Sequence, residues 1–195
     1  MSRKTENAVK KSKGALRSRP TGTRQTRKRF IIACEGAKTE RSYLRQLCDK
    51  LFSDKIFLEF PPCKSSAGSV LQGMKKRLKS KDRDDGDQAW LVVDVDQNPE
   101  SVLKELYQWP NQETGYGLAL SNPCFEYWLL LHFDEGKSIN TPSRCKEELQ
   151  KHYSDYDKAD LQIHRFFGEE KELKKMQEHL LNVIRRAKKR ITLRR

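Results

Sequence analysis

Hydrophobic residues along the chain follow two alternating patterns. Short apolar runs bounded by glycine, proline or polar residues predict β-strands; they cover residues 30–34, 56–60, 89–97 and 116–121. Between these runs, apolar residues recur every three or four positions, which predicts amphipathic helices; these cover residues 39–52, 69–78 and 100–108. Alternation of this kind is typical of an α/β fold, so we expect a mostly parallel four-stranded sheet with helices on both faces.

After the last of these strands the pattern becomes helical. The segment "SNPCFEYWLLLHF" (121–133) predicts a largely buried helix, with Asn122 as its N-cap and Pro123 in its first turn. A loop is expected over residues 134–145 and a helical extension over about 141–195. The face of the last helix that we expect to pack on the domain consists of Leu173, Met176, Leu180, Ile184 and Ala187.

Positive charge is concentrated at the two ends of the chain. Residues 1–28 contain ten Lys or Arg and one acid, and residues 185–195 contain seven and none, which leaves −3 of the total of +13 for the middle. The first segment predicts a disordered basic arm, which would either bind nucleic-acid phosphates or only solubilise the protein. The second ends a helix, where basic residues either contact nucleic acid or interact with the helix dipole. Its candidate nucleic-acid contacts are Arg185, Arg186, Lys188, Lys189 and Arg190.

Composition argues against several protein classes. No run approaches the ~18 apolar residues of a membrane span, and no apolar signal region follows the basic N-terminus, so we expect a soluble, cytoplasmic protein. The five cysteines are an odd number without a C-x-x-C pair, which argues against a disulfide framework and a zinc site. We expect reduced, mostly buried thiols.

Acidic residues follow two of the predicted strands directly. Glu35 ends the first strand, and Asp94 and Asp96 end the third. The carboxyl ends of parallel strands meet at one edge of the sheet, and residues two apart on a strand share a face, so these carboxylates should converge. Converging carboxylates repel one another unless a cation neutralises them, and oxygen ligands of this kind favour Mg²⁺ or Mn²⁺. Because bound Mg²⁺ keeps positions open for phosphate oxygens, the pattern predicts a phosphodiester-cleaving site; the alternative is that these residues only cap a helix or form turns.

Other residues near these positions are further candidates. Gly36 would let the backbone turn close to a metal or phosphate, and Lys38 would contact phosphate or simply be solvated. Glu126, one turn into its helix, is a candidate to complete the metal shell. His132 is expected to be a hydrogen-bonded core residue rather than a ligand.

Two charged segments predict features outside the carboxylate site. The run "KSKDRDDGDQ" (79–88) lacks the ligand spacing of a calcium loop and is expected to be a solvated loop. Tyr153 and Tyr156 lie in a charged segment and are candidates for a contact surface.

Three motifs in order, "CEGAKTE", "VVDVDQN" and "SNPCFEYWLLLHF", resemble the RloB family. Its members are Toprim-type proteins associated with restriction and phage-defence loci; Toprim domains also occur in topoisomerases, primases and OLD-type nucleases. The resemblance covers roughly residues 29–190, and it implies a Toprim-like, Rossmann-like domain over 29–195. It also implies that Glu35 is a general acid/base or faces the metal, and that Asp94 and Asp96 bind Mg²⁺. Glu40 is a further candidate ligand. It lies one residue later than in the E-G-x-T-E motif of OLD-type nucleases, but its position matches the E-G-x-K-T-E form that resembles RloB proteins.

The resemblance and the carboxylates together predict a Mg²⁺-dependent nuclease that acts as an anti-phage defence effector. A topoisomerase or a replicative primase would need further domains for which this chain has little room. Proteins that resemble RloB are often encoded beside OLD-like or AAA ATPases. The alternative is therefore a nucleic-acid-binding or regulatory subunit of such an ATPase complex, inactive alone.

Overall fold

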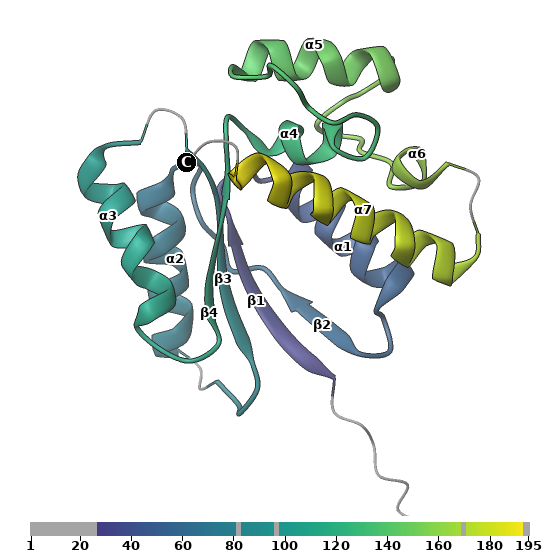
Figure 1. The fold of residues 1–195 in the computed structure, drawn as a ribbon. Coiled ribbons are helices and arrows are strands. Elements are labelled where there is room, and N and C mark those ends of the chain that lie inside the picture. The colour runs from purple at the N-terminus through teal and green to yellow at the C-terminus, as the bar shows by residue number, and fades with distance from the viewer. Residues whose placement is uncertain (1–26, 81–82, 96–97, 169–170, 193–195) are drawn as a thin grey trace, which may run out of the picture.

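A computed structural model describes residues 27–80, 83–95, 98–168 and 171–192 (Figure 1). The strands are β1 (Lys28–Cys34), β2 (Ile56–Glu59), β3 (Gln88–Asp94) and β4 (Tyr116–Ser121). The helices are α1 (Thr39–Leu51), α2 (Ala67–Ser80), α3 (Glu100–Gln108), α4 (Phe125–Leu130), α5 (Pro142–His152), α6 (His164–Phe167) and α7 (Leu173–Thr192), and the 3₁₀ turn η1 is Trp109–Asn111. The basic arm expected over residues 1–28 lies outside the described residues except for its last two, and β1 already includes Lys28.

The four strands form one parallel sheet in the order β2-β1-β3-β4. This confirms the predicted α/β fold and is consistent with a Toprim-like arrangement. The chain runs from β1 to β2 on one side and then returns to β3 on the other, so the strand order reverses between β1 and β3. In open α/β sheets, the carboxyl edge at such a reversal is where ligand sites form.

Helices cover both faces of the sheet, α2 and α3 on one face and α1 and α7 on the other (Figure 1). The alternation of side chains along β1 explains this: Ile31 and Ala33 pack with α2, whereas Ile32 and Cys34 pack with α1 and the C-terminal helices. Such strands are apolar on both faces because neither face meets water. The five cysteines are free, and all but Cys63 are buried, as expected.

The helix after β4 begins later than predicted. α4 starts at Phe125 with Cys124 as its N-cap, in extended backbone, and the Asn122–Pro123 peptide before it is cis. The prediction of Asn122 as the cap was therefore wrong. The loop expected over 134–145 is also shorter, because α5 begins at Pro142. The Thr141 side chain caps α5 by accepting a hydrogen bond from the backbone N–H three residues later.

The buried face of α7 differs from the predicted one at two positions. Met176 and Val183 are buried, and Ala187 packs against the cluster between α4 and α5. Leu173, expected in the core, is 49% exposed, and Ile184 is only partly buried. Val183 is the most deeply buried of the described residues of α7. The helix packs against α1 in one part and against the α4–α5 pair in another, so the buried side of α7 changes along its length.

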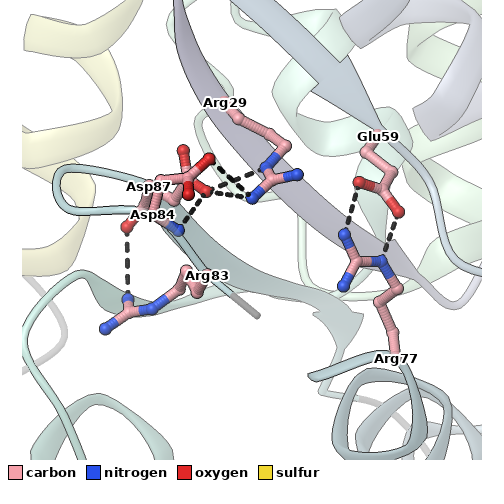
Figure 2. A network of polar contacts seen from close by, with 6 residues as sticks. All are labelled: Arg29, Glu59, Arg77, Arg83, Asp84 and Asp87. Carbon is pink, nitrogen blue, oxygen red and sulfur yellow. Dashed lines mark hydrogen bonds and ion pairs between the residues drawn. The ribbon is translucent and has the colours of Figure 1, made fainter. Parts of the chain in front are cut away.

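The charged segment 79–88 is more ordered than a solvated loop, at least in its described part. Figure 2 shows Arg29 of β1 bound to Asp87 and Asp84. The Asp84 amide donates to the Asp87 carboxylate (3.0 Å), and Arg83 donates to the Asp87 carbonyl (3.2 Å). Asp87 is buried, so the prediction was wrong there; this carboxylate ties the start of β3 to β1.

A second ion pair in Figure 2 joins α2 to the end of β2. The guanidinium of Arg77 donates through two nitrogens to the carboxylate of Glu59. The arginine is only 8% exposed, so this pair is closed to solvent on the cation side. Pairing two planar groups in this way fixes their geometry.

Candidate functional site

Glu35 and Asp94 meet at the carboxyl edge of the sheet, where the strand order reverses. The Glu35 amide donates to the Val92 carbonyl (3.0 Å), so it extends the pairing between β1 and β3 by one residue. Oε2 of Glu35 then accepts a hydrogen bond from the backbone N–H of Asp94 (3.3 Å). Both residues are partly exposed. The structure therefore places the Glu35 carboxylate against the backbone of Asp94 at this edge.

The end of β3 is held by contacts with neighbouring residues. Strand β3 ends at Asp94, whose carbonyl accepts a hydrogen bond from the Asn98 side chain (2.8 Å). The Val95 amide donates to Ser121 of β4 (2.9 Å). Asp96 lies outside the described residues, and with it the expected convergence with Asp94.

Glu40 folds back onto the loop that contains Gly36. Its Oε1 accepts a hydrogen bond from the Gly36 amide (3.1 Å), and its side chain is buried. A Cβ at position 36 would lie 1.7 Å from the other carboxylate oxygen, so a larger residue there would force this carboxylate to move. The pKa of Glu40 is raised, mainly by burial. Hydrogen bonds from its own amide and from Gly36 lower this pKa, whereas the charge of Glu126 raises it further. Lys38 is exposed at the N-cap position of α1 and makes no side-chain cap there.

Glu126 is a buried carboxylate with two polar partners. The Tyr156 hydroxyl donates to its Oε1 (3.2 Å), and the Lys158 ammonium lies 2.5 Å from the same oxygen. Burial alone would raise the pKa of Glu126, but the hydrogen bond and charge of Lys158 lower it overall. Because Glu126 also raises the pKa of Glu40, the two carboxylates lie within electrostatic range of each other.

Tyr156 and Lys158 were not identified from the sequence as site residues. They belong to the irregular segment 153–163 between α5 and α6, which carries no periodic signal. The expectation that Tyr153 and Tyr156 form a contact surface was wrong, because both are buried. Their acidic neighbours in the sequence suggested solvent, whereas tertiary contacts turn the rings inward.

Two residues of α1 hold this segment in place. The Thr39 hydroxyl donates to the Lys158 carbonyl (3.3 Å). The Gln46 side chain donates to the Leu161 carbonyl (2.7 Å) and accepts from the Ile163 amide (3.0 Å). Lys158 is thereby fixed beside the first turn of α1, which also carries Glu40.

The basic end of α7 divides into two groups. Arg186 donates to the Leu131 carbonyl (2.7 Å), and Arg190 donates to the Glu135 carbonyl (2.8 Å), so both dock α7 onto the segment after α4. Lys189 is exposed and lies 3.4 Å from the Glu135 carboxylate. The other two proposed nucleic-acid contacts are exposed: Arg185 and Lys188.

The donor set at the sheet edge suits a hard cation, with one restriction. Carboxylate oxygens favour Mg²⁺ or Mn²⁺, and Mg²⁺ needs only one or two of them. Glu35 and Asp94 are the candidates at this edge, where the Glu35 carboxylate contacts the Asp94 backbone. Glu126 is already paired with Lys158. Among the residues that the structure describes, no three or more His, Cys, Asp or Glu side chains form a group able to hold a metal ion. Nor does any helix in the described ranges have the length and apolar character needed to cross a bilayer.

Comparison with known proteins identifies a family for this chain. A family model described as "RloB-like protein" matches residues 30–193, which is most of the chain. No curated protein and no solved structure matches it.

Proposed function

The chain belongs to the RloB-like protein family, and we propose that it is a Mg²⁺-dependent nuclease of the Toprim type. The observation that carries this proposal is the hydrogen bond from the Asp94 amide to the Glu35 carboxylate, at the reversal of strand order. Two partly exposed carboxylates at such an edge match what a phosphodiester-cleaving site requires.

Each residue has a chemical role in this proposal. Glu35 and Asp94 would hold the cation, with Asp96 as the third candidate ligand. Mg²⁺ or Mn²⁺ bound there would stabilise the charge on the scissile phosphate. Glu35 also moves a proton to or from a reacting oxygen, which requires it to stay within hydrogen-bond reach of the substrate. Gly36 lets the Glu40 carboxylate pack over the loop, and this contact supports the position of Glu35 next to it.

The test is cleavage of labelled DNA and RNA, including tRNA, by the full chain in Mg²⁺, Mn²⁺ or EDTA. The variants Glu35→Gln and Asp94→Asn should each lower the metal-dependent rate by about 100-fold or more. Glu147→Gln, at an exposed position on α5, is the matched control and should cleave like the wild type. Equal cleavage by all four proteins would contradict the proposed site.

We propose anti-phage defence as the biological role, because the family resemblance points to defence loci. Cells that express the wild type, together with any neighbouring OLD-like or AAA ATPase gene, should form fewer plaques than cells with the Glu35→Gln variant. Equal plaque numbers in the two strains would argue against a defence role that depends on this site.

A second candidate is a nucleic-acid-binding or regulatory subunit that is inactive without an ATPase partner. It is favoured by the ion pair between Glu126 and Lys158, which removes one carboxylate from metal binding. Such a protein would bind oligonucleotides equally well in Mg²⁺ and in EDTA and would release no product alone. Addition of the ATPase would then be required before any cleavage is seen.

A further inference from the structure

We propose that Lys158 is a phosphate-binding residue of this site, and that Glu126 positions its ammonium rather than binding the metal. This role rests on the proposed function, because it assumes that a nucleic-acid backbone reaches the carboxyl edge of the sheet. The observation behind it is an unequal ion pair: the Glu126 side chain is 6% exposed, whereas the Lys158 side chain is 60% exposed.

The two ion pairs in Figure 2 that join elements of the fold provide a comparison. Both of their cations are largely covered, because Arg77 is 8% exposed and Arg29 is 23% exposed. In the site, the anion is buried and the cation faces solvent, at 60% exposed. An ammonium has three N–H donors, and the contact with one Glu126 oxygen leaves it able to donate to a ligand from the solvent side.

Lys158 is also held at a defined place. The Thr39 hydroxyl fixes its carbonyl to the start of α1, and Gln46 fixes the rest of the segment further along the same helix. From the other direction, the Tyr156 hydroxyl holds the Glu126 carboxylate that the ammonium contacts. A surface lysine normally moves among many rotamers, and ordering it costs entropy when it binds. Here the backbone of Lys158 is already held by α1, and the contact with Glu126 restrains its ammonium.

A short chain of contacts links Lys158 to the proposed metal carboxylates. Thr39 holds the Lys158 carbonyl, and the next residue, Glu40, contacts the amide of Gly36, which directly follows Glu35. We therefore expect a phosphate at a cation held by Glu35 to come within reach of the exposed Lys158 ammonium. A compact positive charge suits a single phosphate oxygen, and lysine binds phosphate in this way at other sites.

The first test measures Mn²⁺ binding to the full chain by electron paramagnetic resonance, without nucleic acid. Asp94→Asn should abolish binding, whereas Glu126→Gln and Lys158→Gln should leave the affinity within about threefold of the wild type, because neither residue is a ligand. A loss of tenfold or more in Glu126→Gln would show that Glu126 binds the metal, and this would overturn the proposal.

The second test measures binding of fluorescent single-stranded DNA and RNA of one sequence in EDTA, over a range of salt concentrations. Lys158→Gln should bind about tenfold more weakly, and the slope of log affinity against log salt should fall by about 0.7. Lys158→Arg should recover most of the affinity, and Lys146→Gln, an exposed lysine on α5, should bind like the wild type. If Lys158→Gln keeps the wild-type affinity and the wild-type salt dependence, the ion pair between Lys158 and Glu126 has only a structural role and the proposal is wrong.

Folding is controlled with the double variant Lys158→Gln/Glu126→Gln. Lys158→Gln alone leaves a buried carboxylate without its cation and could lower stability, whereas the double variant replaces the ion pair with two neutral amides. It should bind oligonucleotides as weakly as Lys158→Gln and retain the melting temperature of the wild type to within a few degrees. Wild-type oligonucleotide affinity in this folded double variant would overturn the proposal.

The outcomes separate this inference from the proposed function. A wild type that binds the oligonucleotides but does not cleave them would contradict the nuclease, while the Lys158 variants would still decide the phosphate contact. A wild type that cleaves, with unchanged binding and cleavage in Lys158→Gln, would contradict only the role of Lys158. A wild type that binds none of the oligonucleotides would overturn the phosphate contact directly.

Discussion

Acidification should destabilise the fold through His132, which is 3% exposed in the core. Its Nε2 lies 2.8 Å from the Tyr43 hydroxyl, and its Nδ1 lies 3.1 Å from Nε2 of His179. Burial lowers the pKa of His132 from 6.5 to about 3, and the charges of His179 and Arg186 act in the same direction; a hydrogen bond with the Phe166 backbone opposes them. The folded protein therefore keeps this imidazole neutral at pH values where the unfolded chain is protonated.

The sign and size of the effect follow from this difference. Because the folded pKa lies below the unfolded value, the folded state binds fewer protons, and stability is lost as the pH falls from about 6.5 towards about 3. Each pH unit in this window lowers the free energy of unfolding by about 1.4 kcal/mol. At about pH 5 the loss from His132 is about 2 kcal/mol, which lowers the melting temperature of a chain of this size by about 4–8 °C.

The assay is urea unfolding of the wild type and of His132→Gln at a series of pH values between about 7.5 and about 4.5. Glutamine can still hydrogen-bond to Tyr43 but does not titrate, so the variant should lose stability less steeply by about 1.4 kcal/mol per pH unit. His152→Gln, at an exposed histidine, is the control and should follow the wild-type slope. Parallel curves for the wild type and His132→Gln would refute a buried neutral imidazole.

Three further changes should alter stability by amounts that urea unfolding can measure. Gly36→Ala should cost about 1–3 kcal/mol because the new methyl group displaces the Glu40 carboxylate; wild-type stability would mean that this contact is not made. Asp87→Asn should cost about 1–3 kcal/mol because it weakens a buried charge-assisted network at the start of β3, and an unchanged midpoint would contradict that. Val183→Ala should cost about 2 kcal/mol, whereas Leu181→Ala, at an exposed position of the same helix, should stay within about 0.5 kcal/mol; equal losses would mean that the buried face of α7 is assigned wrongly.

The sheet could be predicted from the sequence because its signals are local. Each strand is an apolar run that ends at a glycine, a proline or a charge, and parallel pairing follows from the helices between the runs. The start of α4 could not be predicted in the same way. Asn122 and Pro123 correctly signalled that a helix follows, but its N-cap is two residues later than Asn122. The face of α7 failed for another reason: several registers of its apolar residues are possible, and packing against α1 and α4 selects the one with Val183 innermost.

The same distinction between local signals and tertiary contacts applies to the residues of the candidate site. Glu35 and Asp94 were predicted to meet because both follow parallel strands, and the ends of such strands lie at one edge whatever the loops do. Tyr156 and Lys158 reach the site from a segment without periodicity, and their position depends on Gln46 and other contacts made only in the folded chain. Residues positioned by secondary structure are therefore visible in the sequence, and residues positioned by tertiary contacts are not.

Charge content is a weaker guide to the nucleic-acid contacts than charge position. The basic end of α7 has the highest density of positive charge in the described residues, yet Arg186 and Arg190 donate to the carbonyls of Leu131 and Glu135 and so stabilise the helix packing. An arginine that satisfies carbonyls at the end of a neighbouring segment looks, in a sequence, the same as one that binds phosphate. Lys158 lies in the part of the chain where acids outnumber bases, but its ammonium is exposed beside the carboxylates of the site. If phosphate binds as proposed, we expect this one exposed cation to have more influence on it than cations whose donors are already used within the fold.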